Sequence, residues 1–132
     1  MTDSPIEAHR EGPFAVLTLC QAERRNPLSK ETLTALLAAL RESDSKDARG
    51  VILAAKGPVF SAGHDFRDLE ACDLEATRDL LTLCREVMQT LQQLRLPVVA
   101  QVEGLATAGG CQLVASCDLA VASASARFAV PG

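Results

Sequence analysis

Two glycine-containing segments hold the residue types in this chain that are best suited to chemistry. One is Phe60-Ser61-Ala62-Gly63-His64-Asp65, and the other runs from Gly104 to Gln112. Each follows an apolar run that predicts a buried strand, and each turns through small residues into a predicted helix. We expect this arrangement to bring the backbone N–H groups of His64 and Gly109 to one point. Two converging amides can stabilise the negative charge that develops on a carbonyl oxygen.

The glycines themselves favour this interpretation. Gly63 and Gly109-Gly110 let a ligand approach the backbone closely because they have no Cβ. Gly109 opens a predicted helix, where amides are unpaired and the helix dipole favours negative charge. Taken singly, glycine-rich turns of this kind also occur merely to pack a helix on a sheet. The patterns G-x-G-x-x-G and G-x-x-x-x-G-K-[ST] are absent, which disfavours a nucleotide phosphate site.

Composition excludes several classes of function. The chain has 132 residues, enough for one domain, and 48% of them are hydrophobic although only 3% are aromatic. Its net charge is −4, and it has no basic stretch of the kind that binds nucleic acid, so a nucleic-acid partner is not expected. It has no apolar run long enough to cross a membrane, and no secretory signal or transit sequence is recognisable. We therefore expect a cytoplasmic protein.

The five cysteines predict reduced core thiols. They are scattered along the chain and form no C-x-x-C pair, so we expect neither a zinc site nor any other metal site. Cys111 and Cys117 flank the last predicted helix, where packing is the expected role.

The pattern of elements predicts an α/β fold. Residues 1–13 are a polar lead-in, and residues 14–132 form the core. Strands are expected at 14–20, 51–55, 98–102 and 119–122, with a further strand at 127–129 that pairs with a neighbour. Helices are expected after Ser29, which is a good N-cap, through residues 80–94, and at 108–116. This alternation indicates parallel strands joined by right-handed crossovers.

Four segments, in order along the chain, resemble sequence elements of the crotonase (enoyl-CoA hydratase/isomerase) superfamily. Residues 24–29 resemble its R-x-N-A-L-[ST] element, and residues 60–65 resemble F-[SA]-A-G-x-D. Residues 104–118 resemble G-x-[AC]-x-G-G-G-x-[EQ]-L-x-x-x-C-D, with Ala108 in place of one glycine. Residues 127–132 resemble A-x-F-x-x-P-E. The chain is similar to the N-terminal half of that fold, and we expect it to be truncated before the C-terminal helices.

The resemblance implies a spiral of ββα turns with parallel strands that binds an acyl-CoA thioester in fatty-acid or related metabolism. The amides of His64 and Gly109 would form the oxyanion hole, and coenzyme A would be part of the substrate, with no separate cofactor. A full-length protein would form a homotrimer or hexamer. The residues expected to line the coenzyme A path are Arg24, Arg25, Ser61, Ala62, Gly63, His64, Asp65, Phe66, Arg67 and Gly109.

Two positions depart from the hydratases of the family. Gln112 and Gly132 stand where the resemblance places two catalytic glutamates, and neither can move a proton as a carboxylate does. The departures leave open isomerisation, other acyl-CoA chemistry, or a catalytically inactive relative that binds acyl-CoA as a regulator or scaffold. A flavodoxin-like or other nucleotide-binding domain is a third, less supported alternative.

Single side chains near these motifs have simpler expected roles. The His64 ring is expected at the rim of the pocket while its amide acts. Asp65 is expected to cap the following helix rather than to act as a base. Asp118 is expected to anchor the start of a strand. Arg24, Arg25 and Arg67 would meet phosphates together, although each alone is typical of a solvated charge.

Overall fold

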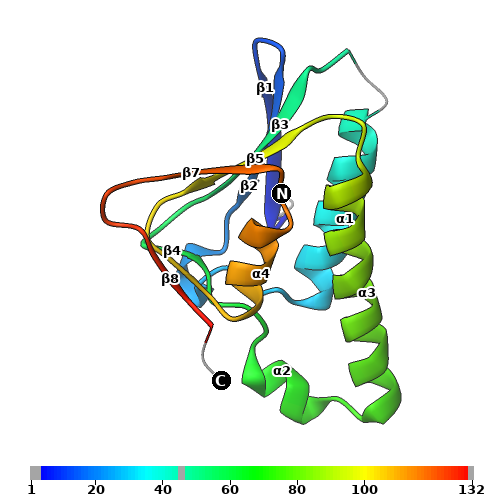
Figure 1. The fold of residues 1–132 in the computed structure, drawn as a ribbon. Coiled ribbons are helices and arrows are strands. Elements are labelled where there is room, and N and C mark those ends of the chain that lie inside the picture. The colour runs from blue at the N-terminus through cyan, green and yellow to red at the C-terminus, as the bar shows by residue number, and fades with distance from the viewer. Residues whose placement is uncertain (1–3, 45–46, 131–132) are drawn as a thin grey trace.

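The computed structural model describes residues 4–44 and 47–130. Successive ββα units along the chain contribute strands to two sheets (Figure 1). The larger sheet has the strand order β1-β2-β3-β5-β7 and the smaller has the order β4-β6-β8. Strands β2, β3, β5 and β7 run parallel, as do all three strands of the smaller sheet. The predicted α/β fold with parallel strands is therefore confirmed.

The larger sheet collects the apolar strands. Its members are β1 (Ile6–Glu11), β2 (Phe14–Leu19), β3 (Gly50–Ala55), β5 (Val98–Val102) and β7 (Leu119–Ala122). Four of the five strands agree closely with the predicted ranges. The fifth, β1, lies within the predicted lead-in and pairs antiparallel with β2. Only the first residue of β1, Ile6, is buried, so the strand has no apolar pattern that could have predicted it. Main-chain pairing with β2 holds the strand in place.

The smaller sheet is built from three-residue strands that directly follow members of the larger one. They are β4 (Val59–Ser61), β6 (Leu105–Thr107) and β8 (Arg127–Ala129). Each pair of strands is followed by a helix or by the end of the described chain, which is the ββα repeat. The predicted pairing of residues 127–129 is confirmed, since β8 pairs with β6.

The helices are α1 (Lys30–Asp44), α2 (Phe66–Ala71), α3 (Leu74–Gln93) and α4 (Gly109–Ala115), with a 3₁₀ turn, η1, at Ala22–Arg24. The long helices α1 and α3 lie side by side (Figure 1). Ser29 caps α1 as predicted, because its Oγ accepts a hydrogen bond from the Thr32 N–H at 3.2 Å. Asp118 anchors the start of β5, since Oδ2 accepts the Val98 N–H at 2.7 Å.

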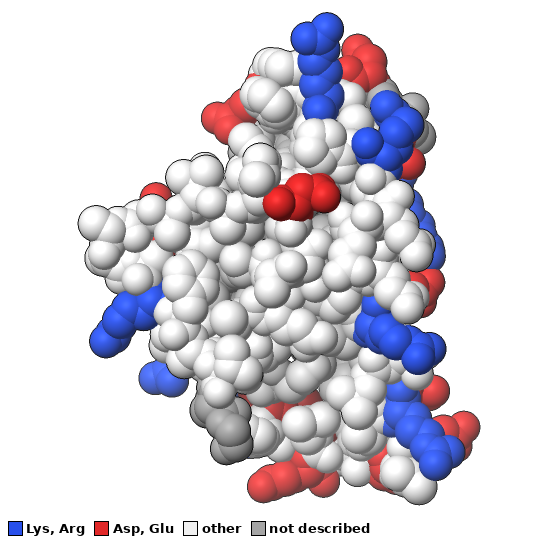
Figure 2. Space-filling model, in the orientation of Figure 1, with Lys and Arg blue, Asp and Glu red and all other residues white. Residues whose placement is uncertain are grey.

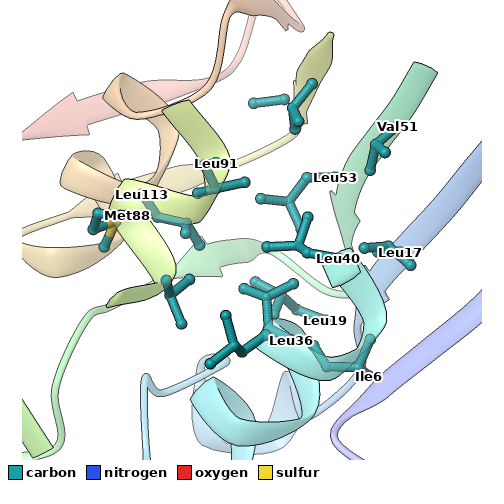
Figure 3. Close-up of a cluster of buried hydrophobic side chains, with 14 of the residues drawn as sticks. Ile6, Leu17, Leu19, Leu36, Leu40, Val51, Leu53, Met88, Leu91 and Leu113 are labelled. Carbon is teal, nitrogen blue, oxygen red and sulfur yellow. The ribbon is translucent and has the colours of Figure 1, made fainter. Parts of the chain in front are cut away.

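An aliphatic core lies between the helices and the larger sheet (Figure 3). Leucines of α1 at helical spacing, Leu33, Leu36 and Leu40, are fully buried against strand residues such as Leu17 and Leu53. Burying one such leucine contributes roughly 1.5–3 kcal/mol relative to leaving it exposed. The core also includes Phe60 of β4 and Ala106 of β6, the strands that precede the two glycine segments. On the face of the molecule shown in Figure 2, charged side chains lie mainly around the edge.

Candidate functional site

The two glycine segments meet in the structure. Gly63 has φ +83°, and a Cβ placed on it would lie 2.7 Å from the Gly109 nitrogen and 3.3 Å from its Cα. Gly110 is equally close to the other segment, because a Cβ there would overlap the Ser61 carbonyl. The contact therefore requires glycine on both sides.

Two amides without acceptors belong to residues at or next to this contact. Gly109 is the first residue of α4, and His64 directly follows Gly63. Within residues 4–44 and 47–130, neither the His64 N–H nor the Gly109 N–H has a hydrogen-bond acceptor. Amides left free in this way are available to a ligand oxygen.

Asn26 holds the site together from beneath, and the sequence analysis did not single it out. The residue is 1% exposed. Oδ1 accepts the Gln21 N–H at 2.8 Å, and Nδ2 donates to the carbonyls of Lys56 and Val59 at 3.0 and 2.9 Å. All its polar positions are thus used in tying the η1 loop to the start of β4. The only signal in the sequence was its place in the 24–29 motif.

Ser61 continues this support. The residue is fully buried. Its hydroxyl donates to the Asn26 carbonyl at 2.8 Å and accepts the Gly63 N–H at 3.1 Å. A hydroxyl enclosed in this way positions the Gly63 turn.

A pocket of about 380 Å³ opens beside the Gly63 turn. It brings together most of the residues predicted for coenzyme A, which come from the η1 loop and from the segment that enters α2. The lining residues are Glu23, Arg24, Arg25, Pro27, Ala62, Gly63, His64, Asp65, Phe66 and Arg67. Of the predicted set, Ser61 and Gly109 lie outside this lining.

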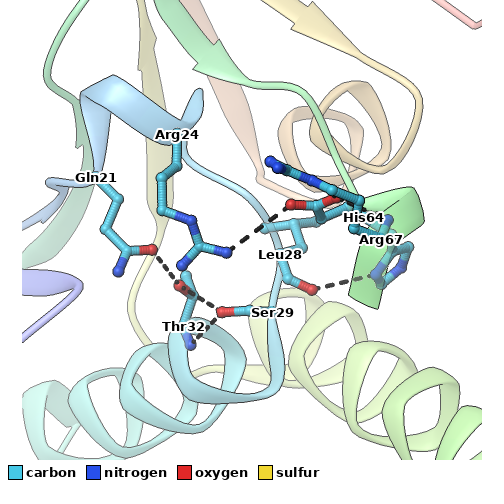
Figure 4. Close-up of polar contacts among 8 residues, drawn as sticks. Gln21, Arg24, Leu28, Ser29, Thr32, His64 and Arg67 are labelled. Carbon is cyan, nitrogen blue, oxygen red and sulfur yellow. Dashed lines mark hydrogen bonds and ion pairs between the residues drawn. The ribbon is translucent and has the colours of Figure 1, made fainter. Parts of the chain in front are cut away.

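Asp65 pairs with two cations of the pocket, Arg24 and Arg67, which are labelled in Figure 4. Its carboxylate lies 3.9 Å from Arg24 Nη2 and 3.6 Å from Arg67 Nε. Oδ1 also accepts the Arg67 N–H at 2.9 Å, which caps α2 as predicted. A carboxylate occupied by two cations and a cap is poorly suited to act as a base.

Positive charge and an exposed ring dominate the outer part of the pocket. The Arg67 side chain is 88% exposed and that of Arg24 is 42% exposed. Phe66 is 79% exposed, which is unusual for a large apolar side chain. Arg25 supports the wall through its backbone, since its carbonyl accepts the Ala62 N–H at 3.0 Å.

His64 belongs to the lining of this pocket, and its ring is held by one contact. Its Nδ1 lies 3.1 Å from the Leu28 carbonyl oxygen (Figure 4). Leu28 is fully buried, and its own N–H donates to the Gly63 carbonyl at 2.9 Å. The ring is therefore held against a fixed part of the backbone.

Of the two positions at which the family has catalytic glutamates, the structure describes only one. Gln112 lies exposed on α4, and its N–H donates to the Ala108 carbonyl at 3.1 Å. Gly132 lies outside the described residues. Ala108, which precedes α4, has φ +52° and ψ −121°, a conformation that side-chain-bearing residues rarely adopt.

The remaining candidates concern metals, membranes and thiols. Among the described residues, no group of three or more His, Cys, Asp or Glu side chains could hold a metal ion. No helix in that part of the chain is long and apolar enough to cross a membrane.

All five cysteines are free; Cys84 is buried, as predicted for a core thiol, whereas the other four are half-buried. Burial, aided by the Asp118 charge, raises the pKa of the Cys117 thiol to about 12.

Comparison with known sequences identifies relatives of this arrangement. The sequence model of the family described as enoyl-CoA hydratase/isomerase matches residues 9–132. The rat protein named enoyl-CoA hydratase domain-containing protein 3, mitochondrial, is 45% identical over 118 residues, covering 88% of this chain and 39% of that protein. The short-chain-enoyl-CoA hydratase of Clostridium acetobutylicum is 32% identical over 124 residues, covering 92% and 48%.

Solved structures agree. The crystal structure of human enoyl coenzyme A hydratase domain-containing protein 3 superposes with a TM-score of 0.88 at 40% identity, covering 97% of this chain and 51% of that one. The enoyl-CoA hydratase of Thermoplasma volcanium gives a TM-score of 0.93 at 25% identity, covering 98% and 52%. The chain spans 39% to 52% of the length of these four relatives, so it corresponds to roughly the N-terminal half of the fold. It belongs to the enoyl-CoA hydratase/isomerase family of the crotonase superfamily.

Proposed function

We propose that this chain binds an acyl-CoA thioester and stabilises its enolate with the backbone amides of His64 and Gly109. The observation that supports the proposal is the contact between Gly63 and Gly109, next to which the N–H groups of His64 and Gly109 have no acceptor among the described residues. An enolate oxygen between them would gain about 3–4 kcal/mol from each donor, judging from single donors of other oxyanion holes.

The pocket next to the amides supports coenzyme A as the carrier. Arg24, Arg25 and Arg67 surround an opening that also exposes Phe66. Guanidinium groups pair with phosphates through charge-assisted hydrogen bonds, and an exposed aromatic ring offers a stacking surface for an adenine. Asp65 holds Arg24 and Arg67 near each other before a ligand arrives.

A second, adjoining pocket offers room for the acyl group. It measures about 480 Å³, lies between the starts of α1 and α3, and shares Arg24 with the first pocket. Its walls combine the apolar side chains of Leu80 and Leu83 with charged ones such as Lys30 and Asp79. A short acyl chain that carries a polar group fits such a lining better than a long hydrocarbon.

Calorimetry tests the proposal with two ligands that differ at one group. Acetoacetyl-CoA presents a thioester carbonyl, whereas an S-butyl thioether of coenzyme A lacks it. We expect acetoacetyl-CoA to bind more tightly and to develop the ultraviolet absorption of its enolate on binding. Absence of binding by both ligands at millimolar concentration would refute the acyl-CoA site. Equal binding of the two would refute the oxyanion hole alone.

The proposal also covers the oligomeric state and the cellular location of the full-length protein. By analogy with its family, the full-length protein would be a homotrimer or hexamer in fatty-acid or related acyl-CoA metabolism. The sequence favours a cytoplasmic location, whereas the names of the vertebrate relatives assign those proteins to mitochondria. Sedimentation of the full-length protein and fractionation of the source cells test these two points separately.

A further inference from the structure

Few groups near the proposed amide pair could move a proton. Gln112 has no titratable side chain, and Asp65 is engaged by Arg24, by Arg67 and by its capping bond. The other titratable side chains of the pocket lining are three arginines, which stay protonated in proteins, Glu23 and His64. Of these, His64 is the residue whose backbone N–H also belongs to the proposed amide pair.

The hydrogen bond with the Leu28 carbonyl favours one tautomer of the neutral His64 imidazole. A carbonyl oxygen only accepts hydrogen bonds, so Nδ1, at 3.1 Å, must carry the hydrogen in the neutral ring. The lone pair is then on Nε2. No described residue hydrogen-bonds to Nε2. The contact therefore leaves a free acceptor on the opposite edge of the ring.

That edge lies near the amide pair. The Cδ2 atom of His64, which is bonded to Nε2, lies 3.7 Å from the position that a Cβ on Gly109 would occupy. The ring edge with Cδ2 therefore faces the first turn of α4, where the Gly109 N–H is free. A thioester whose oxygen met the Gly109 N–H would therefore lie beside this edge of the ring.

We propose that His64 is the proton-transfer residue of this site and acts through Nε2; this rests on the proposed acyl-CoA function. The Nε2 lone pair takes a proton from the carbon next to the thioester carbonyl. The electron pair of the broken C–H bond moves into the enolate, whose oxygen is held by the His64 and Gly109 amides. Return of a proton from the imidazolium to carbon regenerates the neutral ring, and no other reactant is needed.

Nitrogen NMR of the ring tests the tautomer without any ligand. In protein labelled with ¹⁵N at histidine, we expect the neutral His64 ring to show a protonated Nδ1 and an unprotonated Nε2. His9, the other histidine of the chain, lies exposed on β1 and serves as the internal reference. A His64 ring with the hydrogen on Nε2 would overturn the proposal.

Exchange of the α-hydrogens of an acyl-CoA with deuterium tests the chemistry. The variant His64→Gln keeps the backbone amide and has a polar side chain but no base. We expect its exchange rate to fall by about 10²- to 10⁴-fold while acetoacetyl-CoA binding changes less than about threefold. His9→Gln is the matched control and should leave both unchanged.

The outcomes separate the two proposals. Unchanged exchange in His64→Gln, or binding without exchange in the wild-type protein, overturns the role of His64 and leaves the acyl-CoA site standing. Loss of binding in the wild-type protein overturns the proposed function itself. A parallel loss of binding and exchange in His64→Gln alone would show that the ring positions the loop, which also overturns proton transfer.

Discussion

Gly63 lies so close to Gly109 that a Cβ on Gly63 would come within 2.7 Å of the Gly109 nitrogen. The two residues come from different ββα units, so their contact joins the turn before α2 to the start of α4. The position of the paired amides thus depends on the absence of a side chain at residue 63.

Replacing this glycine should damage both fold and site. In Gly63→Ala the positive φ costs about 1–3 kcal/mol, and the overlap with Gly109 adds about 1–3 kcal/mol. We expect the free energy of unfolding in urea to fall by about 2–6 kcal/mol. Binding of acetoacetyl-CoA should be lost under conditions in which the variant is still folded.

Gly12→Ala is the control for backbone strain alone. Gly12 also has a positive φ, +58°, but a Cβ there meets nothing within 4 Å. We expect this variant to lose only about 1–2 kcal/mol, the cost of the left-handed conformation, and to bind as the wild type does. Equal destabilisation of the two variants would contradict the argument from contact with Gly109.

Asn26 offers a second test, since its amide serves three backbone groups. Asn26→Asp keeps the acceptor for the Gln21 N–H but removes both donors to the carbonyls of Lys56 and Val59. Leaving those carbonyls unpaired beside a buried charge should cost about 2–5 kcal/mol in the free energy of unfolding.

The control is Gln92→Glu, the same change of amide to acid at an exposed position of α3. We expect it to alter the free energy of unfolding by less than about 0.5 kcal/mol. A similar small effect of Asn26→Asp would mean that the η1 loop does not depend on these hydrogen bonds.

The sequence predicted the regular parts of the fold because their patterns are strong. The leucines of α1 recur at helical spacing, and the apolar runs of β5 and β7 match the observed strands residue for residue. Strands β4 and β6 have three residues each, too few to show any periodicity, and β1 is polar. These elements owe their place to main-chain pairing with neighbours.

The site was predictable to a similar extent. The approach of the two glycine segments followed from the motifs, as did the capping role of Asp65. The bonds of Asn26 and Ser61 did not, because they run to backbone groups some 30 to 35 residues away along the chain. The tautomer of His64 depends in the same way on the carbonyl of Leu28, 36 residues earlier.

Cys117 should resist alkylation although it is only half-buried. The thiolate is the reactive form, and a pKa of about 12 leaves roughly 10⁻⁴ of the Cys117 population ionised at pH 8. The Sγ–H also faces the Leu113 carbonyl at 3.5 Å. Because the pKa is raised, the rate of alkylation should increase with pH throughout the range below 12.

Mass spectrometry of peptides after iodoacetamide treatment measures this rate. We expect native Cys117 at pH 8 to react at least about 10²-fold more slowly than in urea, where its pKa returns to the ordinary value. Cys72 and Cys111, which are also half-buried, are the internal references in the same digest. Alkylation of Cys117 as fast as Cys72 would contradict the assigned effect of burial.

The last prediction concerns Ala108, which occupies a glycine position of the family motif with φ +52° and ψ −121°. Only glycine adopts this backbone conformation without strain. Ala108→Gly should therefore relieve about 1–3 kcal/mol of strain, partly offset by about 1 kcal/mol of added chain entropy in the unfolded state. We expect a net stabilisation of about 1 kcal/mol in urea unfolding.

Ala38→Gly makes the same chemical change at an exposed position within α1 and should destabilise the protein by about 1 kcal/mol. Both substitutions remove one methyl group. If they change the free energy of unfolding in opposite directions, the difference identifies backbone strain at residue 108. Equal destabilisation would show that Ala108 is relaxed. Because Ala108 immediately precedes Gly109, relief of the strain should also let the Gly109 amide move. We accordingly expect Ala108→Gly to bind acetoacetyl-CoA somewhat more weakly even as its stability rises.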